Sequence, residues 1–380
     1  MWDAVVESGG VMDRTLVSRG ARRSAGVIAS LVLVVVLVAP AGASPRGERD
    51  LTVMTQNLYL GSSLTPALAA QSPGEFIAAI AQIYATVQYT DFPARADAIA
   101  SEIDAHRPDL IGLQEVSIWT TAGAGAPTGY DFLAILQAEL VSRGLDYSVA
   151  AVAENADIGP APLATPSCIS GGAITCTVRL QDRDVILVND DRSDLTWSDP
   201  RTGRYEAQAD IQSPVGPLSF DRGWATIEAR LAGQPFRFAN THLETEDFPA
   251  VQEAQATEFL AGPARGGTVV ATGDFNSAAD GSTTTSYDQL TAPGRFRDAW
   301  DEALLAPGWT CCQQSNTPPL APGALNNPVS TLRTRIDLVL ARGAARPQGA
   351  TVVGEVPFQA MPPFWPSDHA GVVAEIRLSR

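Results

Sequence analysis

Hydrophobic residues recur along this chain with two different spacings. Apolar residues at helical spacing predict helices over residues 76–87, 94–105, 132–141 and 251–260. Alternating or continuous apolar runs between polar, Gly-rich connections predict strands over 51–58, 109–114, 184–188, 224–231, 236–243, 268–272, 335–341 and 371–378. This mixture favours an α/β sandwich with helices outside and sheets within.

One stretch departs from both patterns. Residues 306–329 are rich in Pro, Asn and Gly and contain two adjacent cysteines. Strand signals resume directly behind this stretch, so we interpret it as a long irregular loop within one domain that spans residues 48–380. Loops of this length in compact domains are often functional.

The N-terminal segment has the pattern of an export signal. Arg22 and Arg23 precede an apolar run over residues 26–38, and Ala-Gly-Ala follows at 41–43. The run is shorter than the ~20 residues of a bilayer span. We therefore expect a cleaved signal peptide over residues 1–43, no transmembrane span in the mature chain, and a secreted protein. A retained N-terminal anchor is the alternative, and the paired arginines also fit a twin-arginine signal.

Composition narrows the class of protein. Of the 380 residues, 45% are hydrophobic and 18% are charged, which excludes a disordered chain. The formal charge is -16, and removal of residues 1–43 takes away four arginines and three acids to leave -17. Such a charge argues against a broad basic face for nucleic acid, although a local basic groove is compatible with it.

Four cysteines follow the signal segment: Cys168, Cys176, Cys311 and Cys312. An even number in an exported protein favours disulfides, and four cysteines allow three pairings. Cys168 with Cys176 would close a short loop, but would leave Cys311 and Cys312 to a strained direct bond. A crossed pairing would join two distant loops. Zinc is disfavoured because the chain has no C-x-x-C pair and no nearby histidine.

Polar groups stand inside or at the ends of several predicted hydrophobic strands, where they cost free energy unless they are paired or coordinate a cation. Their placement suggests a shared site. These residues are Asn57, Glu115, His242, Asp274, Asn276, Asp337, Asp368 and His369.

Each of these residues also has a purely structural interpretation. Asn57 would cap a turn, Asp274 and Asn276 would form an Asx turn, and His242 would be a core histidine. Asp337 would pair with a neighbouring arginine. The common placement of these residues at strand ends favours the functional interpretation. His106, at the end of a polar helix, is interpreted as structural.

The motifs NL, LQEV, NTHLE, GDFNS, RIDLVL and SDH occur in this order between Asp50 and Leu378. In this respect the chain resembles the endonuclease/exonuclease/phosphatase superfamily, which has the deoxyribonuclease-I-like fold. The resemblance implies a four-layer αββα sandwich, with the site at one end of the two sheets. It also implies hydrolysis of a phosphoester with a divalent metal ion, Mg²⁺ or Mn²⁺.

The resemblance assigns roles to the residues that match these motifs. It implies that Glu115 is the main metal ligand, that Asn57 lies beside it, and that Asp368 lies near the metal or its water network. Asp274 would orient or deprotonate the attacking water. Asn276 would help to hold the phosphate.

The resemblance also implies roles for the two histidines. His242 would donate to a phosphate oxygen, and His369 would be an acid/base facing the phosphate and positioned by Asp337. Family members carry a further phosphate-contacting Tyr or Arg, for which Arg222 is our candidate; its alternative interpretation is a surface arginine. These residue types fit the chemistry, because a hard cation and hydrogen-bond donors neutralise the charge of a phosphate under attack.

Residues 153–219 match no motif, and we interpret the acidic residues Asp190, Asp191 and Asp194 within them as a solvated face. Basic residues gather at Arg333, Arg335 and Arg342, and the aromatic residues Trp309, Phe364 and Trp365 lie in or near loops. Aromatic residues beside the site would stack on a base or contact a lipid headgroup or surface.

The substrate is left open by these motifs, because one scaffold hosts many activities. The acidic charge favours an exported phosphodiesterase or phosphatase that acts on a small or lipid-derived ester. An extracellular nuclease acting on DNA or RNA is the alternative. A non-catalytic binding module on the same fold is a third hypothesis, disfavoured because the complete set of polar residues is present.

Overall fold

The computed structural model describes residues 49–213, 215–300 and 307–379, and these belong to a compact unit that spans Arg46–Arg380. The predicted signal peptide over residues 1–43 lies outside the described residues. No described helix has the length and apolar character needed to cross a membrane.

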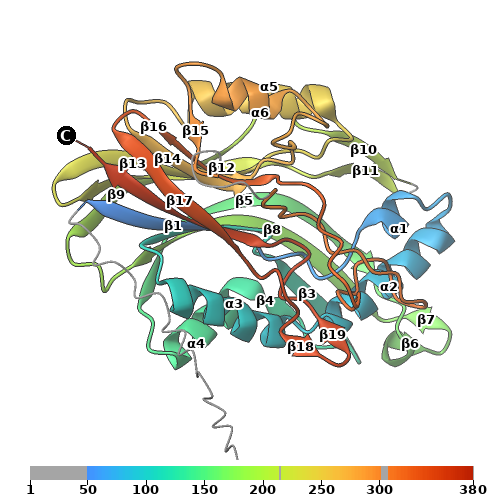
Figure 1. The fold of residues 1–380 in the computed structure, drawn as a ribbon. Helices are drawn as coiled ribbons and strands as arrows, with labels where there is room; N and C mark the ends of the chain where they lie inside the picture. Colours follow the sequence, from blue (N-terminus) through green and yellow to red (C-terminus); the bar gives the residue numbers. More distant parts are fainter. Residues whose placement is uncertain (1–48, 214, 301–306, 380) are drawn as a thin grey trace, which may run out of the picture. The chain divides into compact units, whose positions relative to one another are not determined.

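Two sheets form the centre of the unit (Figure 1). In the described residues, the first sheet has the order β17 (Ala345–Val353), β20 (Gly371–Leu378), β1 (Asp50–Asn57), β2 (Leu110–Gln114), β8 (Cys176–Asn189), β3 (Ile118–Gly123) and β4 (Tyr130–Asp131), and β5 (Tyr147–Pro162) also pairs with β8. The second has the order β15 (Arg297–Asp298), β16 (Asp337–Arg342), β14 (Val269–Asp274), β13 (Gln234–His242), β12 (Gly223–Leu231) and β9 (Leu195–Arg204).

Short elements extend this framework. Three small hairpins pair β6 (Ile169–Ser170) with β7 (Ala173–Ile174), β10 (Asp210–Ser213) with β11 (Gly216–Ser219), and β18 (Gln359–Ala360) with β19 (Pro363–Phe364). The helices are α1 (Thr65–Leu68), α2 (Pro73–Tyr89), α3 (Phe92–His106), α4 (Phe132–Ser142), α5 (Pro249–Ala261) and α6 (Ser286–Thr291), with a 3₁₀ turn at Pro166–Cys168.

Helix ends follow local sequence signals. The Ser72 hydroxyl accepts from the Glu75 backbone N–H at the start of α2, which satisfies a donor that has no partner within the helix. Asp131 does the same for α4 through the Leu133 N–H. The predicted helices over 76–87, 94–105, 132–141 and 251–260 all lie within α2 to α5.

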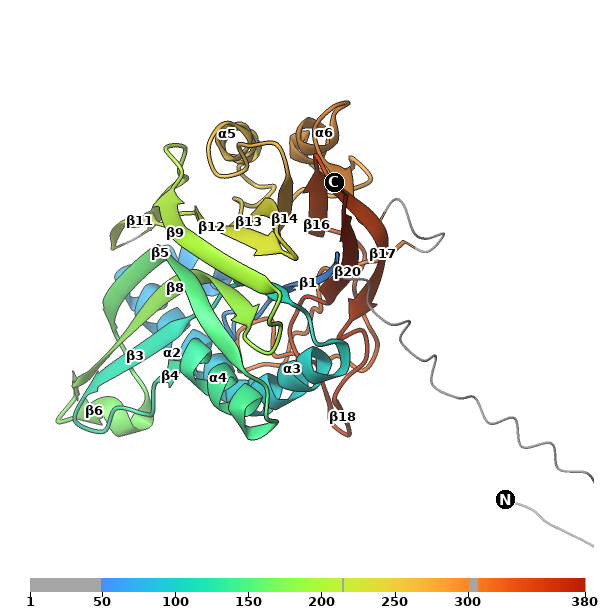
Figure 2. The same ribbon diagram turned by 90° about the vertical axis from the view of Figure 1, so that its left-hand side faces the viewer.

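Three hydrophobic cores separate four layers. One joins α2, α3 and α4 to the first sheet, for example through Ile83, Ile99 and Leu113. A second lies between the sheets, and a third joins α5 and α6 to the second sheet, for example through Phe259 and Leu340. Figures 1 and 2 show the helices on the two outer sides. The predicted αββα sandwich is confirmed.

The register of the strands brings distant motifs to one edge. β1 pairs with β2 in parallel, and β13 pairs with β14 in parallel, so the carboxyl ends of each pair meet. β16 runs antiparallel to β14, which places Asp337 directly opposite Asp274. The Asn57, Glu115, His242, Asp274 and Asp337 motifs therefore all end at the same side of the sandwich.

A buried polar network joins the two sheets below this edge. The Gln114 amide donates to the Asn240 side chain at 2.6 Å, and Asn240 donates to the Leu113 carbonyl at 2.9 Å. Gly112 leaves room for this contact, since a Cβ there would lie 2.1 Å from the Thr272 hydroxyl. Asn240 of the NTHLE motif is thus a bridge between sheets.

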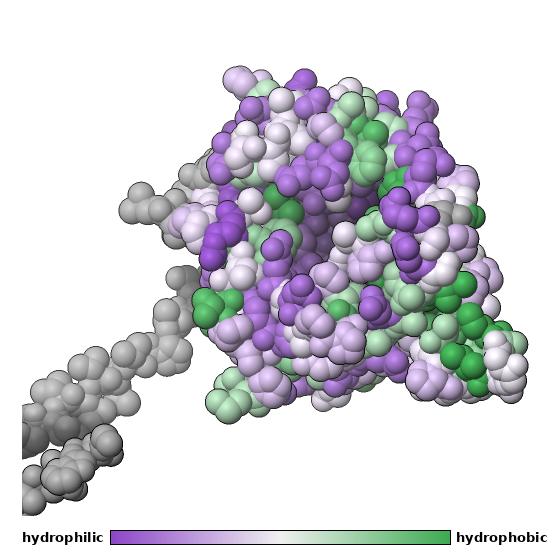
Figure 3. All heavy atoms as spheres, turned by 90° about the vertical axis from the view of Figure 1, so that its right-hand side faces the viewer, coloured by the Kyte–Doolittle hydropathy of each residue, from purple (hydrophilic) through white to green (hydrophobic). Residues whose placement is uncertain are grey.

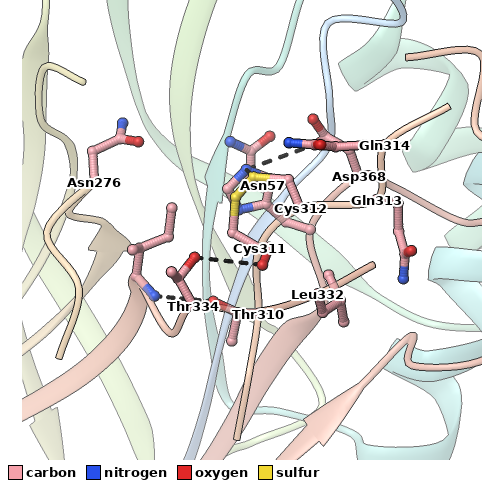
Figure 4. The surroundings of a disulfide bond; sticks show 12 residues. Asn57, Asn276, Thr310, Cys311, Cys312, Gln313, Gln314, Leu332, Thr334 and Asp368 are labelled. Carbon is pink, nitrogen blue, oxygen red and sulfur yellow. Dashed lines mark hydrogen bonds and ion pairs between the residues drawn. A yellow bond between two sulfur atoms is a disulfide. The ribbon is translucent and has the colours of Figure 1, made fainter. Parts of the chain in front are cut away.

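The irregular loop, with Cys311 and Cys312, lies near the same edge. In the part that the structure describes, residues 307–329 form no helix or strand. Cys168 pairs with Cys176, which closes the β6–β7 hairpin, and Cys311 is joined to its neighbour Cys312 (Figure 4). The crossed pairing considered from the sequence is not the one found.

Candidate active site

Asn57 is the last residue of β1, and Glu115 directly follows β2. The Asn57 side-chain oxygen accepts from the Tyr59 N–H at 2.8 Å, and its amide donates to Asp274 Oδ2 at 3.0 Å. Glu115 Oε2 accepts from the Leu60 N–H at 2.6 Å. Glu115 has a φ of 54°, a left-handed conformation that costs free energy for a residue with a side chain and is enriched at functional sites.

Asp368 is brought to these residues by the SDH turn before β20. The Ser367 hydroxyl donates to the Asn57 carbonyl at 2.7 Å and accepts from the His369 N–H at 3.1 Å. Burial raises the pKa of Asp368 to about 7; His369 opposes this rise and the nearby Glu115 carboxylate adds to it. Two carboxylates and an amide that converge in this way are the oxygen donors that a hard divalent cation prefers. The donor set therefore fits a hard divalent cation.

Asp274 lies at the centre of the cluster and is 1% exposed. Its Oδ2 lies 3.5 Å from His242 Nε2 and 3.7 Å from His369 Nε2. Burial and the facing Asp337 raise the pKa of Asp274 to about 7. A carboxylate with this pKa can exchange a proton near neutral pH.

His369 and Asp337 form a buried pair. His369 Nδ1 lies 2.8 Å from Asp337 Oδ2, which leaves Nε2 directed toward Asp274. Burial alone would lower the pKa of His369, but Asp337 and the neighbouring carboxylates outweigh burial and raise it well above its usual value. These carboxylates favour the charged form of His369, which carries one proton on each ring nitrogen.

His242 is held between Arg222 and Asn276. A guanidinium nitrogen of Arg222 lies 3.0 Å from Nδ1 and 3.1 Å from Nε2 of the ring, and the Asn276 amide lies 3.0 Å from Nε2. Burial, Arg222 and His369 lower the pKa of His242 well below its usual value, so the ring is neutral. Both neighbours carry N–H donors, and a neutral imidazole accepts at one of its two ring nitrogens, so the tautomer decides which contact His242 accepts. Donation from His242 to a phosphate, as the sequence predicts, requires these contacts to rearrange when substrate binds.

Arg222 is mostly buried in this cluster and is not a surface arginine. Its guanidinium lies 3.4 Å from Glu244, and its side chain is 11% exposed. Burial alone would lower the pKa of Arg222, but Glu244, Asp182 and further carboxylates raise it. A charged guanidinium at this position is suited to bind a phosphate oxygen.

A cleft of about 660 Å³ opens above these residues. Glu115, Arg222, Asp368 and Cys312 line it, together with residues of α1 and of the 307–329 loop. Figure 3 shows a hollow lined mainly by hydrophilic residues on the corresponding face of the molecule. Figure 4 shows the Cys311–Cys312 pair close to Asn57, Asn276 and Asp368, and Cys312 Sγ lies 3.9 Å from His369 Nε2.

The comparisons with known proteins point in one direction. The sequence profile of the Endonuclease/Exonuclease/phosphatase family matches residues 54–369. The chain belongs to this family. Its members are phosphoesterases and nucleases.

Solved structures of the Endonuclease/Exonuclease/phosphatase family share the fold. A family protein from Bacteroides thetaiotaomicron is 16% identical, with a TM-score of 0.54 over 87% of this chain and 95% of the other. TDP2 of D. rerio, solved with a single-strand DNA product, is 13% identical, with a TM-score of 0.50 over 86% of this chain and 99% of the other. No curated protein matches the sequence.

Sequence analysis missed two buried carboxylates beside His242. Asp182 and Asp184 on β8 are 5% and 0% exposed, and ligand atoms of both lie within 4.8 Å of one another and of a His242 ring nitrogen. Burial and the Glu115 carboxylate raise the pKa of Asp182 to about 7, while burial and Asp182 raise that of Asp184 well above its usual value. Two carboxylates spaced two residues apart in a buried strand are the signal that would have found them.

The arginines expected to gather, and the aromatic residues expected to contact a base or a headgroup, are instead dispersed. Arg335 is buried and paired with Asp298, and Phe364 and Trp365 belong to a small buried cluster with Tyr59. Arg342 lies at the end of β16 that is farthest from Asp337. Trp309 remains exposed, with the Arg333 guanidinium 5.6 Å from its ring centroid.

The buried aspartates predict how stability depends on pH. Asp182, Asp274 and Asp368 have pKa values of about 7 in the folded chain against 3.8 as the ordinary value. Between these values the folded state binds more protons than the unfolded state, so the free energy of unfolding falls as pH rises. His242, whose pKa is lowered, acts in the opposite sense. Metal-free protein should therefore have a higher Tm at pH 5.5 than at pH 7.5.

Thermal melts of variants test whether the buried aspartates cause this pH dependence of Tm. Asp274→Asn should reduce the pH dependence of Tm, whereas the exposed Asp190→Asn should leave it unchanged. A Tm of the wild-type chain that rises from pH 5.5 to pH 7.5 would contradict the assignment.

Proposed function

We propose that this chain is an exported, divalent-metal-dependent phosphoesterase that hydrolyses a phosphodiester or phosphomonoester by in-line attack of water. The observation that carries the proposal is that the His369–Asp337 pair and Asp274 converge beside one cleft, which the carboxylates of Glu115 and Asp368 line. The exported location rests on the signal pattern of residues 1–43.

Glu115, Asp368 and Asn57 would hold the cation, because together they offer oxygen donors and two carboxylate groups. When bound, a divalent cation neutralises phosphate charge and polarises the P–O bond. Arg222 and Asn276 would bind the remaining phosphate oxygens, with His242 holding both in place.

Asp274 would orient the attacking water and take its proton, as its raised pKa supports. His369 would stabilise the charge that develops on the phosphate or donate its Nε2 proton to the leaving oxygen. Asp337 would hold the His369 ring and favour its charged form. The chain would thus supply a base and an acid next to each other at the reacting phosphate.

The lining of the cleft favours a small or lipid-derived ester over a nucleic acid. Arg222 is the basic residue among the described residues that line it, whereas four acids, Glu115, Glu244, Asp247 and Asp368, also line it. A long chain of phosphates would be repelled by this balance of charge. A volume of about 660 Å³ is typical of a small-molecule site.

Hydrolysis of bis(4-nitrophenyl) phosphate tests the proposal. Purified protein should turn the ester over with Mg²⁺ or Mn²⁺, and a chelator should stop the reaction. His369→Ala should lower kcat by about 10²–10³, the effect of removing one donor to the developing charge. Turnover that survives both the chelator and His369→Ala would refute the mechanism.

A substrate panel separates the two candidate classes. Plasmid DNA, RNA, sphingomyelin and soluble phosphate esters should be offered in parallel at two salt concentrations. We expect the small or lipid-derived esters to be hydrolysed fastest. Strong cleavage of DNA or RNA that weakens with salt would instead assign the protein as an extracellular nuclease.

A further inference from the structure

A second hollow, of about 790 Å³, lies at the other end of the second sheet. β14 and β16 pair along their length, with Asp274 opposite Asp337 at the catalytic end and Val269 opposite Arg342 at the other. The hollow opens there, between the loops that follow α5, α6 and β16, and Figure 2 faces this end. We call it the arginine groove, after its lining residues Arg265, Arg295, Arg297, Arg342 and Arg346.

The charge of the arginine groove is unlike that of the rest of the chain. The residues that line it include five arginines and no Asp or Glu, although the chain carries 42 acids and 26 basic residues, all of them arginine. Elsewhere most described arginines pair with carboxylates, as Arg179 does with Asp157. Among the described residues, no ion pair joins Arg265, Arg295, Arg342 or Arg346 to an acid. Four uncompensated cations in one concave surface attract anions.

The floor of the groove is fixed by Arg342. Its guanidinium donates to the carbonyls of Gly266, at 3.1 Å, and Ala264, and it lies 4.8 Å from the Phe296 ring centroid. Burial lowers the pKa of Arg342, and no carboxylate counteracts this. Gly343 has a φ of 73°, and a Cβ there would lie 2.0 Å from the Gly267 carbonyl, so the two walls are closely packed.

We propose that the arginine groove binds a soluble multivalent phosphate anion. Guanidinium groups match phosphate oxygens in pairs, and arginines on separate loops can be contacted together only by an anion with several charged groups. Arg265, Arg295 and Arg346 are exposed and open to such a ligand.

The residues that line the arginine groove argue against two other anionic ligands, nucleic acid and a membrane surface. Its aromatic residue, Phe296, is 3% exposed beneath Arg342, so the groove offers no platform for nucleic-acid bases to stack on. A membrane surface is planar, whereas this surface is concave, and the groove residues include none of the large exposed hydrophobic side chains that insert into lipid.

Calorimetric titration with inorganic tripolyphosphate tests the proposal on the metal-free chain. The variant Arg265→Gln/Arg295→Gln/Arg346→Gln should bind about tenfold more weakly or worse than wild type, because charge-assisted contacts are lost. Arg201→Gln/Arg230→Gln, which removes two exposed arginines from β9 and β12, should bind as wild type does. The groove variant should hydrolyse bis(4-nitrophenyl) phosphate at the wild-type rate.

Arg222→Gln distinguishes the groove from the catalytic cleft and should leave tripolyphosphate affinity unchanged. Affinity lost in Arg222→Gln but kept in the groove variant would overturn the proposal, as would no binding to the wild-type chain. Titrations with single-stranded DNA of matched charge and with anionic phospholipid vesicles complete the test. Tighter binding of either, dependent on the groove arginines, would also overturn the assignment.

Discussion

Replacing Asp337 by asparagine should lower kcat for bis(4-nitrophenyl) phosphate by about 10³–10⁴, as loss of the carboxylate does in other His–Asp pairs. The Asp337 carboxylate stabilises charged His369 and fixes its ring, and an amide of the same shape does neither. The other carboxylate oxygen of Asp337 has no partner in the described residues, so the substitution breaks no further hydrogen bond. Tm should stay close to that of the wild type.

The pH dependence of kcat distinguishes the proposed role of Asp337 from a purely structural one. Asp337 raises the pKa of His369, so its loss should move the alkaline limb of kcat to lower pH. The matched control is Asp298→Asn, which alters a buried carboxylate that accepts from Tyr287 and pairs with Arg335 outside the cleft. This control should lower stability but not kcat. Wild-type kcat and an unshifted profile in Asp337→Asn would remove the pairing from the mechanism.

Asp274→Asn should lower kcat by about 10²–10⁴, the range expected when a positioned general base is lost. The amide keeps the shape of the side chain but has one oxygen to accept from the Asn57 amide or the Asn276 N–H, both of which bind Asp274, and it cannot take a proton from water. KM should change little, because Arg222 and Asn276 carry the contacts proposed for substrate binding.

Asp280→Asn is the matched control, since Asp280 is exposed on the loop that follows the same strand. Its activity should equal that of wild type. Mn²⁺ affinity provides a second check, because Asp274 is assigned as the base and not as a ligand. An Asp274→Asn variant that loses Mn²⁺ binding in parallel with activity would contradict this division of roles.

The fold and most of the site could be predicted because their signals are local. Each apolar run ends at a polar residue, and parallel pairing of β1 with β2 and of β13 with β14 brings those ends together. Asn57, Glu115, Asp274 and the other predicted residues accordingly lie within or beside one cleft. The order of the motifs along the chain identified the family that the comparisons then showed.

The features that sequence analysis did not predict depend on three-dimensional contacts, which the spacing of residues along the chain does not encode. Arg335 and Arg342 are close in sequence, yet Arg335 precedes β16 and Arg342 ends it, and the six residues of this strand span roughly 20 Å. They therefore lie at opposite ends of the second sheet, one paired with Asp298 and the other in the arginine groove. The closeness of these two arginines in the sequence therefore suggested a cluster that the structure does not contain.

Apart from residues 184–188, the strands of residues 153–219 were missed for another reason. β5 contains Gly159, Pro160 and Pro162, which are signals for turns, and its register against β8 shifts three times. These interruptions hide the alternation that a regular strand shows. Asp182 was consequently placed outside any strand, and its position beside His242 became visible only in the structure.

Binding of Mn²⁺, followed by electron paramagnetic resonance, tests the central claim most directly. We expect one tight site in the wild-type chain, retained in the exposed control Asp190→Asn. In Glu115→Gln its affinity should fall by about tenfold or more, which corresponds to ~1.4 kcal/mol, and hydrolysis should follow occupancy of the site. Equal Mn²⁺ affinity in the wild-type chain and in Glu115→Gln would contradict a cation held by Glu115 beside Asp274 and His369.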